Sequence, residues 1–264
     1  IRAAIIEGDS FHRYDREEMK QAIAEAENQG ERPVSHFGPR ANLFAELEAL
    51  FRTYGDSGTG KRRFYVHNEQ EASALGHKPG TFTPWEELPD DTDVLFYEGL
   101  HGGVRAEGVN AARYVDLLIG VVPIVNLEWI QKIHRDTRAR GYSVEAATDT
   151  ILRRMHDYVH YVTPQFSHTH VNFQRVPVVD TSNPFVARDI PTLDESLVVV
   201  RFRDPTGVDF PYLLTMIHDS FMSRPNCIVV PGGKMEMAIQ LVATPLLQTI
   251  MERRKSAKQA DGPY

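Results

Sequence analysis

One apolar run that ends in an acid and a glycine constrains the fold more than any other feature of this sequence. Residues 93–102 read Asp-Val-Leu-Phe-Tyr-Glu-Gly-Leu-His-Gly. Because the apolar residues follow one another without polar alternation, they predict a parallel strand that is buried on both faces. Glu98 then emerges at the carboxyl end of this strand, where open α/β sheets bind their ligands.

Two other segments have the same form. Residues 4–9 place Asp9 directly after a strand expected over residues 1–6. Residues 117–122 predict a third strand, which leads through Pro123 into a helix rich in Lys and Arg. We expect these strand ends to meet at one rim of the sheet, where two acids and a cationic helix would handle phosphate and a divalent metal.

Composition narrows the class of protein. A chain of 264 residues with 42 % hydrophobic content can bury one substantial core, so we expect a single α/β domain over residues 1–264. The formal charge of −7 argues against a general nucleic-acid binder. Cys227 is the only cysteine, which fits a reducing, cytoplasmic setting. No apolar run approaches the roughly 18 residues of a membrane span.

The loop after the first strand carries a candidate base. Asp9 is followed by His12, Arg13, Arg16 and Lys20, which would supply positive charge beside it. The alternative is structural: Asp9 would cap the helix expected over residues 16–28, since Asp is a favoured cap, and the cations would form a solvated helix face.

The helix expected over residues 126–140 is the most informative one. Lys132, Arg135, Asp136 and Arg140 recur at spacings of three and four, so they share a face. We interpret this face as part of the active site because the helix directly follows the third strand; an exposed face with an internal ion pair is the alternative.

A glycine break over residues 141–143 leads to a second helix that carries Arg153 and Arg154. We interpret residues 136–160 as a lid that closes over a polyphosphate.

Two further motifs are similar in spacing to known sites, one to a phosphate-binding loop and one to a zinc site. Residues 55–61 look like a phosphate-binding P-loop, but Arg62 replaces the Ser or Thr that binds magnesium, and the segment follows a helix and precedes a strand expected over residues 63–67. We therefore predict a flexible glycine turn.

His156 and His160 have the spacing of zinc ligands, but Asp157 replaces the expected glutamate and no third ligand is evident nearby. Further strands are expected over residues 176–179, 197–202 and 227–230, and a helix over residues 235–253.

Four sequence blocks together resemble one family. Residues 6–13, 96–102, 126–136 and 176–185 resemble bacterial phosphoribulokinases of the octameric, NADH-activated class, and the match spans nearly the whole chain. The resemblance implies a P-loop kinase-like, three-layer α/β sandwich with a mixed, mainly parallel sheet flanked by helices. It also implies transfer of the γ-phosphoryl group of Mg-ATP to the C1 hydroxyl of ribulose 5-phosphate, in the Calvin cycle, with NADH as allosteric activator and a homo-octameric assembly.

The resemblance assigns roles to matching positions. Asp9 would be the catalytic base, and Glu98 the acid that supports Mg²⁺ together with Asp9. The remaining assignments are His12, Arg16 and Lys20 for the sugar phosphate, Lys132, Arg135 and Asp136 for the active-site helix, Arg140 for a further substrate contact, Arg153 and Arg154 for the lid, and Arg201, Arg224 and Arg188 for NADH.

The family's P-loop would lie upstream of the Asp9 strand, by roughly thirty residues, the size of a strand, a loop and a helix. Because this sequence begins at Ile1, we expect that such a segment precedes it in the natural chain. Two alternatives stay open. One is a related kinase with another acceptor, such as uridine or pantothenate, against which the blocks around Asp9 and Lys132 argue. The other is a catalytically silent regulatory protein that keeps the effector site of Arg201 and Arg224.

Overall fold

The computed structural model describes residues 1–106 and 108–260. It contains two compact units: an N-terminal unit of residues 1–115 and 152–168, and a C-terminal unit of residues 116–151 and 169–264. The expected single domain over residues 1–264 and the lid over residues 136–160 stay predictions. Among the described residues, no helix combines the length and apolar character that crossing a membrane requires.

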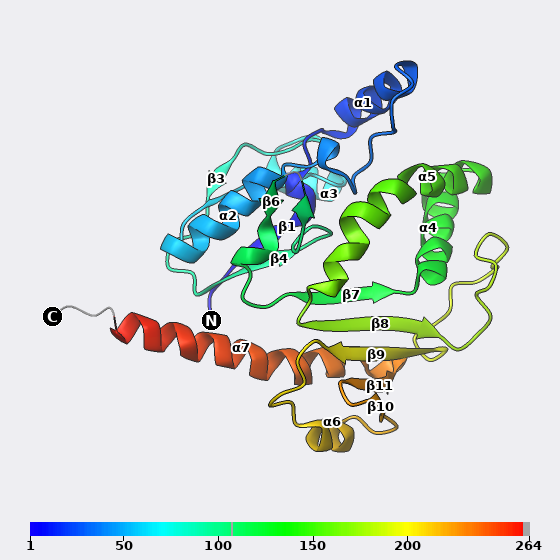
Figure 1. Cartoon of the computed structure of the whole chain (residues 1–264). Helices are drawn as coiled ribbons and strands as arrows, with labels where there is room; N and C mark the ends of the chain where they lie inside the picture. The colour runs from blue at the N-terminus through cyan, green and yellow to red at the C-terminus, as the bar shows by residue number, and fades with distance from the viewer. Residues whose placement is uncertain (107, 261–264) are drawn as a thin grey trace. The chain divides into compact units, whose positions relative to one another are not determined.

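The N-terminal unit is built on two parallel strands. β1 (Ala3–Glu7) pairs with β4 (Val94–Glu98), so that Glu7 lies opposite Glu98. One face of this pair packs on helix α2 (Phe44–Ser57), where Ile6 of β1 joins Leu47 and other apolar residues in a core (Figure 1).

The other face of the β1–β4 pair is open among the described residues. Ile5 and Phe96 are each 56 % exposed on it. The two strands are therefore confirmed, whereas the expected burial of β4 on both faces is wrong for the part of the chain described. An unbroken apolar run did not distinguish a strand covered on one face from a strand covered on both.

Helix α1 (Arg16–Asn28) has the expected bounds because Asp15 caps it. The Asp15 carboxylate accepts hydrogen bonds from the backbone N–H groups of Glu17 and Glu18, and the Glu18 carboxylate accepts one from the Asp15 N–H, all at 2.9 Å. Such a capping box satisfies donors that the first helical turn leaves unpaired. The alternative in which Asp9 caps this helix is thus wrong.

The glycine-rich segment after α2 is a helix end. The helix continues through Ser57, and Gly58 ends it with a φ of +73°, a conformation that favours glycine. This agrees with the predicted turn and leaves no P-loop geometry here. No continuous strand forms over the expected residues 63–67: β2 (Lys61–Arg62) pairs with β3 (Glu86–Glu87), and beyond it Tyr65 makes an isolated antiparallel bridge with Phe82. Between the two, the Phe64 N–H donates to the Thr83 side chain and not to a backbone carbonyl.

Short elements complete this unit. They are the 3-10 turns η1 (Gly8–Phe11), η2 (Pro39–Ala41), η3 (Ala111–Tyr114) and η5 (Thr163–Ser167), helix α3 (Glu69–Leu75), the hairpin β5 (Arg105–Ala106) and β6 (Val109–Asn110), and the π-helical turn η4 (Tyr158–Val162).

The C-terminal unit contains a five-stranded mixed sheet in the order β10-β11-β9-β8-β7. β7 (Ile119–Pro123) and β8 (Val171–Pro177) are parallel, and the pairs of β8, β9 (Ser196–Phe202), β11 (Cys227–Pro231) and β10 (Phe221–Arg224) are antiparallel. Val198 and Val200 of β9 pack with residues of α6 (Phe210–Met216) and α7 (Met235–Ala260).

Several expectations for this unit need correction. β8 begins at Val171 and not at residue 176, and β10 was not predicted. β7 pairs with β8 and belongs to a different sheet from β1 and β4, so hydrogen bonding does not join the three predicted strand ends in one sheet. The helices α4 (Val125–Arg140) and α5 (Val144–Asp157) are confirmed, and Gly141 ends α4 with a φ of +72°.

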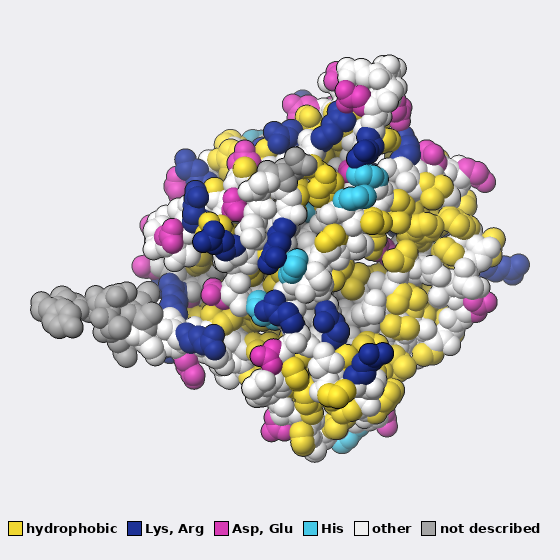
Figure 2. Space-filling view, viewed as in Figure 1, with side chains coloured by type: hydrophobic (Ala, Val, Ile, Leu, Met, Phe, Trp, Pro, Cys, Tyr) yellow, Lys and Arg dark blue, Asp and Glu magenta, His cyan; other side chains and the backbone are white. Residues whose placement is uncertain are grey.

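The surface carries both signs of charge. Figure 2 shows Lys and Arg side chains interspersed with Asp and Glu over the visible face, and not gathered in one cationic field. This distribution agrees with the formal charge of −7.

Two glycines set the spacing at the ends of β1 and β4. A Cβ atom on Gly8 would lie 2.6 Å from Tyr97 Oη and 2.9 Å from Gly99 Cα, and one on Gly99 would lie 2.8 Å from Gly8 Cα. Since real Cβ atoms do not approach so closely, the strand ends can meet only because both residues lack a side chain.

We predict that Gly8→Ala lowers the free energy of unfolding by about 1–3 kcal/mol, the range for overpacking a close contact. Urea unfolding followed by circular dichroism measures it. Gly55→Ala is the matched control, because no heavy atom would lie within 4 Å of its Cβ and alanine favours the helix. Equal stability of the two variants would show that the Gly8 contact is not a constraint.

Candidate active site

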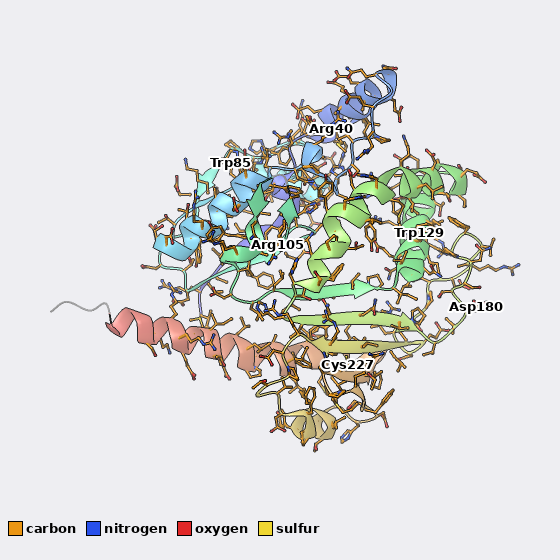
Figure 3. All side chains as sticks on the ribbon, in the orientation of Figure 1. Arg40, Trp85, Arg105, Trp129, Asp180 and Cys227 are labelled. Carbon is orange, nitrogen blue, oxygen red and sulfur yellow. The ribbon has the colours of Figure 1, made fainter. Side chains whose placement is uncertain are left out.

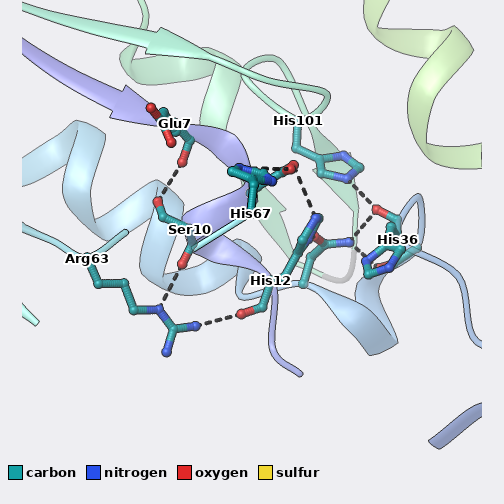
Figure 4. Close-up of polar contacts among 10 residues, drawn as sticks. Glu7, Ser10, His12, His36, Arg63, His67 and His101 are labelled. Carbon is teal, nitrogen blue, oxygen red and sulfur yellow. Dashed lines mark hydrogen bonds and ion pairs between the residues drawn. The ribbon is translucent and has the colours of Figure 1, made fainter. Parts of the chain in front are cut away.

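Asp9 lies in η1, directly after β1, and its carboxylate contacts two of the histidines that Figure 4 labels, His12 and His67. Its Oδ1 is 3.2 Å from His12 Nε2, and its Oδ2 is 4.0 Å from His67 Nε2. The hydrogen bond with His12 holds the pKa of Asp9 below its usual value, although partial burial acts in the opposite direction. Asp9 is therefore an ionised, half-exposed carboxylate at neutral pH, as a general base must be.

His12 is held from the side opposite Asp9. Its ring is buried, and Nδ1 lies 2.8 Å from Asn42 Oδ1. The backbones of these two segments also bind each other, through hydrogen bonds from Leu43 N to Phe11 O and from Arg13 N to Ala41 O, both at 2.8 Å. The position of His12 thus depends on a segment thirty residues further along the chain.

Arg63 fixes the backbone of the same loop. Its Nε donates to Ser10 O at 2.8 Å and its Nη2 to His12 O at 2.6 Å, while its guanidinium lies over the rings of Phe82 and Trp85. Burial lowers the pKa of Arg63. Sequence reasoning missed this residue because the strand predicted for its segment gave no indication that Arg63 reaches a distant loop.

Two further histidines complete the group. Burial lowers the pKa of His36 to about 3 and that of His101 to about 4, so neither ring adds positive charge at neutral pH. His101 Nε2 lies 3.0 Å from the His36 carbonyl oxygen, which can only accept, so Nε2 carries the proton. The His36 ring centroid is 4.4 Å from that of His12. His36 had no role in the sequence interpretation.

Glu98 ends β4 with an exposed side chain and lies beside Glu7 in the strand register. The loop that follows is held by Gln165, whose Oε1 accepts from Gly103 N at 2.9 Å and whose Nε2 donates to Leu100 O at 2.8 Å. Within residues 1–106 and 108–260, no group of three or more His, Cys, Asp or Glu residues is placed to hold a metal ion.

The cations predicted near Asp9 differ in position. Arg16 opens α1, and its Nη2 donates to His67 O at 3.1 Å, which places it beside the histidine group. Lys20 lies on an exposed part of α1 and pairs with Glu17 at 2.7 Å. The structure therefore associates Arg16 with the histidine group and gives Lys20 a local partner.

The two predicted lid arginines lie in the part of α5 that belongs to the N-terminal unit. Arg153 Nη1 is 2.6 Å from Glu27 Oε1 of α1. The charge of Arg154 adds to burial in lowering the pKa of His36, so Arg154 lies near the histidine group.

The histidine pair His156 and His160 is not arranged as zinc ligands. The two rings stack with centroids 4.1 Å apart, and His160 Nδ1 lies 2.7 Å from His156 O. The His156 ring also contacts Arg32 at 2.8 Å and Asp157 at 3.2 Å. Its nitrogens are thus occupied by protein groups.

In the C-terminal unit, the predicted cations of α4 gather around one buried carboxylate, that of Asp136. The Asp136 side chain is 4 % exposed; Lys132 Nζ lies 2.5 Å from its Oδ2, Arg140 Nη1 3.0 Å from Oδ1 and Arg135 Nε 3.8 Å from Oδ1. The internal ion pair of the alternative interpretation is therefore present, but its carboxylate is not solvated. On the same helix lies Trp129, which Figure 3 labels; its ring centroid is 5.6 Å from that of Phe185.

Of the three arginines predicted to bind NADH, two lie on neighbouring strands of the sheet and the third lies in a loop. Arg201 of β9 and Arg224 of β10 both lie opposite Cys227 of β11 in the strand register, so they flank it on neighbouring strands. Arg188 lies in an exposed loop, and its carbonyl oxygen accepts from Arg138 Nη2 at 3.2 Å.

Comparison with known proteins adds an independent finding. The model of the "Phosphoribulokinase / Uridine kinase family" matches residues 1–182. The chain is 66 % identical over 259 residues to a chromosomal phosphoribulokinase of Cupriavidus necator, which covers 98 % of this chain and 89 % of that protein. It is 61 % identical over 255 residues to a phosphoribulokinase of Nitrobacter vulgaris, which covers 97 % of this chain and 88 % of that protein.

The fold is also similar to that of a phosphoribulokinase. A solved structure described as phosphoribulokinase from Rhodobacter spheroides matches with a TM-score of 0.90 and 56 % identity, covering 97 % of this chain and 89 % of that chain. In sequence and in fold, this chain belongs to the phosphoribulokinase / uridine kinase family.

Proposed function

We propose that the protein is an ATP-dependent kinase that phosphorylates the C1 hydroxyl of D-ribulose 5-phosphate, giving ribulose 1,5-bisphosphate for the Calvin cycle. The observation that carries this proposal is the ionised Asp9 at the end of β1, held at one oxygen by His12. The names and high identity of the relatives support the sugar-phosphate acceptor.

In the proposed reaction Asp9 takes the proton of the C1 hydroxyl as the hydroxyl oxygen bonds to the γ-phosphorus. The bond between that phosphorus and the bridging oxygen breaks, and ADP leaves. Phosphoryl transfer requires the protein mainly to position the reactants and to stabilise charge. His12, Arg16, Lys20 and Arg140 are proposed to bind the sugar phosphate, which arginine suits because its planar fork can donate two parallel hydrogen bonds.

Glu98, together with Asp9, is proposed to hold Mg²⁺. Mg²⁺ keeps several waters and binds phosphate oxygens, so it needs only one or two protein carboxylates. The exposed Glu98 carboxylate fits that requirement. When bound, the ion would neutralise charge on the phosphates.

The cations of α4 and α5 are proposed to stabilise the charge that develops on the transferring group. Lys132 and Arg135 would act directly, and Arg153 and Arg154 from the lid. Asp136 would orient Lys132, since its buried carboxylate lies 2.5 Å from Nζ.

Regulation and assembly are part of the proposal. NADH would activate the enzyme through Arg201, Arg224 and Arg188, and the protein would form a homo-octamer, as the sequence resemblance implies. The adjacent positions of Arg201 and Arg224 beside Cys227 support a common ligand for these two residues.

The direct test measures ADP release by the purified full-length protein with Mg-ATP and each of three acceptors. Ribulose 5-phosphate should be phosphorylated, and uridine and pantothenate should not. Phosphorylation of uridine or pantothenate in place of the sugar phosphate would favour the related-kinase alternative, and no turnover with any acceptor would favour the regulatory protein.

We predict that Asp9→Asn lowers kcat by about 10²–10⁴-fold, the range for loss of a general base, with little change in KM for either substrate. Asp56→Asn, on the exposed surface of α2, is the matched control and should leave kcat unchanged. A rise in the sugar-phosphate KM without a fall in kcat would assign Asp9 to substrate binding only.

We predict that Arg201→Ala abolishes the stimulation of turnover by NADH, because it removes a cation from the proposed effector site. The ratio of turnover with and without NADH measures this. Arg52→Ala, exposed on α2, is the control and should keep the wild-type ratio. An unchanged ratio in Arg201→Ala would remove Arg201 from the effector site.

A further inference from the structure

Arg63 closes the turn that carries Asp9 (Figure 4). The carboxyl end of a helical turn leaves backbone carbonyls without a partner inside the turn, and a cationic side chain can bind them from outside. Here the carbonyl of Ser10 accepts from Arg63 Nε at 2.8 Å, and that of His12 accepts from Nη2 at 2.6 Å. One guanidinium therefore spans the segment through which the backbone leaves Asp9.

The carbonyls between these two positions are bonded by the backbone. His12 N donates to Asp9 O at 3.1 Å, and Leu43 N donates to Phe11 O at 2.8 Å. From Asp9 to His12, the carbonyls thus alternate between a backbone partner and Arg63. A planar fork suits this arrangement, because two of its N–H groups can donate side by side to two acceptors.

The guanidinium is itself held by aromatic rings. Its Cζ lies over the Phe82 ring, 3.7 Å from the centroid, and over the Trp85 ring at 4.8 Å, distances at which a cation is attracted to a ring face. Trp85, which Figure 3 labels, also meets Phe11 of the turn edge to face, with centroids 5.5 Å apart. The turn and the guanidinium therefore pack on the same ring.

The neighbouring Arg62 makes similar contacts that do not reach the turn. It is also half-buried, lies 4.9 Å over the Phe64 ring and pairs with Glu86 Oε1 at 2.9 Å. These contacts join the two sides of the segment that β2 and β3 begin, whereas the hydrogen bonds of Arg63 go to η1 and the residue after it. The two arginines thus separate the stability of this segment from the position of Asp9.

We propose that Arg63 is a positioning residue for the base: by bridging the carbonyls of Ser10 and His12, it fixes the backbone beside Asp9 and thereby directs the carboxylate toward the acceptor hydroxyl. This inference rests on the proposed function, in which Asp9 takes the proton of that hydroxyl. Displacing a reacting group by about 1 Å can lower turnover by about 10²-fold, so a bridge that acts only through the backbone affects the rate.

The test compares Arg63→Met with Arg62→Met. Methionine keeps an unbranched apolar side chain against the rings and removes the donors. We expect kcat to fall about 10- to 100-fold in Arg63→Met, because two hydrogen bonds from a charged donor are lost, and to stay close to the wild-type value in Arg62→Met. Wild-type kcat in Arg63→Met, or an equal loss in both variants, would overturn the inference.

Two readouts separate positioning from packing. In Arg63→Ala, millimolar guanidinium should restore part of kcat because the ion can donate to both carbonyls, whereas methylammonium at the same ionic strength should not. In an Asp9→Asn background, Arg63→Met should lower kcat no further, because its effect passes through Asp9. Equal effects of the two ions, or additive losses in the double variant, would overturn the inference.

Hydrogen exchange tests the structural step without turnover. Peptides that cover residues 8–13, followed by mass spectrometry, should exchange faster in Arg63→Met than in the wild type, and at the wild-type rate in Arg62→Met. Wild-type exchange in Arg63→Met would overturn the inference. If the wild type phosphorylated no acceptor, the proposed function would fail instead, and this exchange would still decide whether Arg63 holds the turn.

Phe82→Leu is a milder variant for the case in which Arg63→Met does not fold. It keeps both donors of Arg63 and removes one of the rings that hold the guanidinium. We expect kcat to fall about 2- to 5-fold, as for one cation–π contact, and exchange over residues 8–13 to rise. Wild-type kcat together with wild-type exchange in this variant would overturn the inference.

Discussion

The hydrogen bond between His12 and Asp9 is the interaction around which the N-terminal unit is arranged. A partly buried carboxylate loses hydration and is stabilised in its ionised form only by donors that replace water. Here the donor ring is itself held by Asn42, and its backbone by Arg63. Both tethers come from segments far from Asp9 in sequence, so the charge state of one carboxylate depends on the correct packing of three loops.

The C-terminal unit stabilises its own acid in a different way. Asp136 is almost completely buried, and its cations Lys132 and Arg140 stand four residues away on the same helix. Such a cluster forms as soon as α4 forms and needs little from the rest of the fold. This chain therefore combines one acid whose paired cations lie on its own helix with one whose partners come from distant segments, and we expect the second acid to be the more sensitive to distant substitutions.

This difference explains what the sequence could predict. The bounds of α1, the shared face of Lys132, Asp136 and Arg140, and the strands ending at Asp9 and Glu98 all follow from local spacing and capping. The roles of Asn42, His36 and Arg63 do not, because each acts through a contact made by a loop with no periodic pattern. The predicted burial of β4 on both faces is wrong for a similar reason: an apolar run in the sequence does not indicate what packs on each face of the strand. The strand expected over residues 63–67 is reduced to a bridge at Tyr65, because the Phe64 N–H donates to the Thr83 side chain in place of a backbone carbonyl.

The contact between Gly8 and Gly99 has a consequence for redesign of this enzyme. With no side chain at either position, the backbones at the two strand ends touch, and the separation between the segments that carry Asp9 and Glu98 is set by backbone geometry alone. Substitutions elsewhere in the loops can reshape what surrounds an acceptor without placing a side chain in this contact. A search for variants with a new acceptor would therefore keep both glycines and vary side chains in the loops around them.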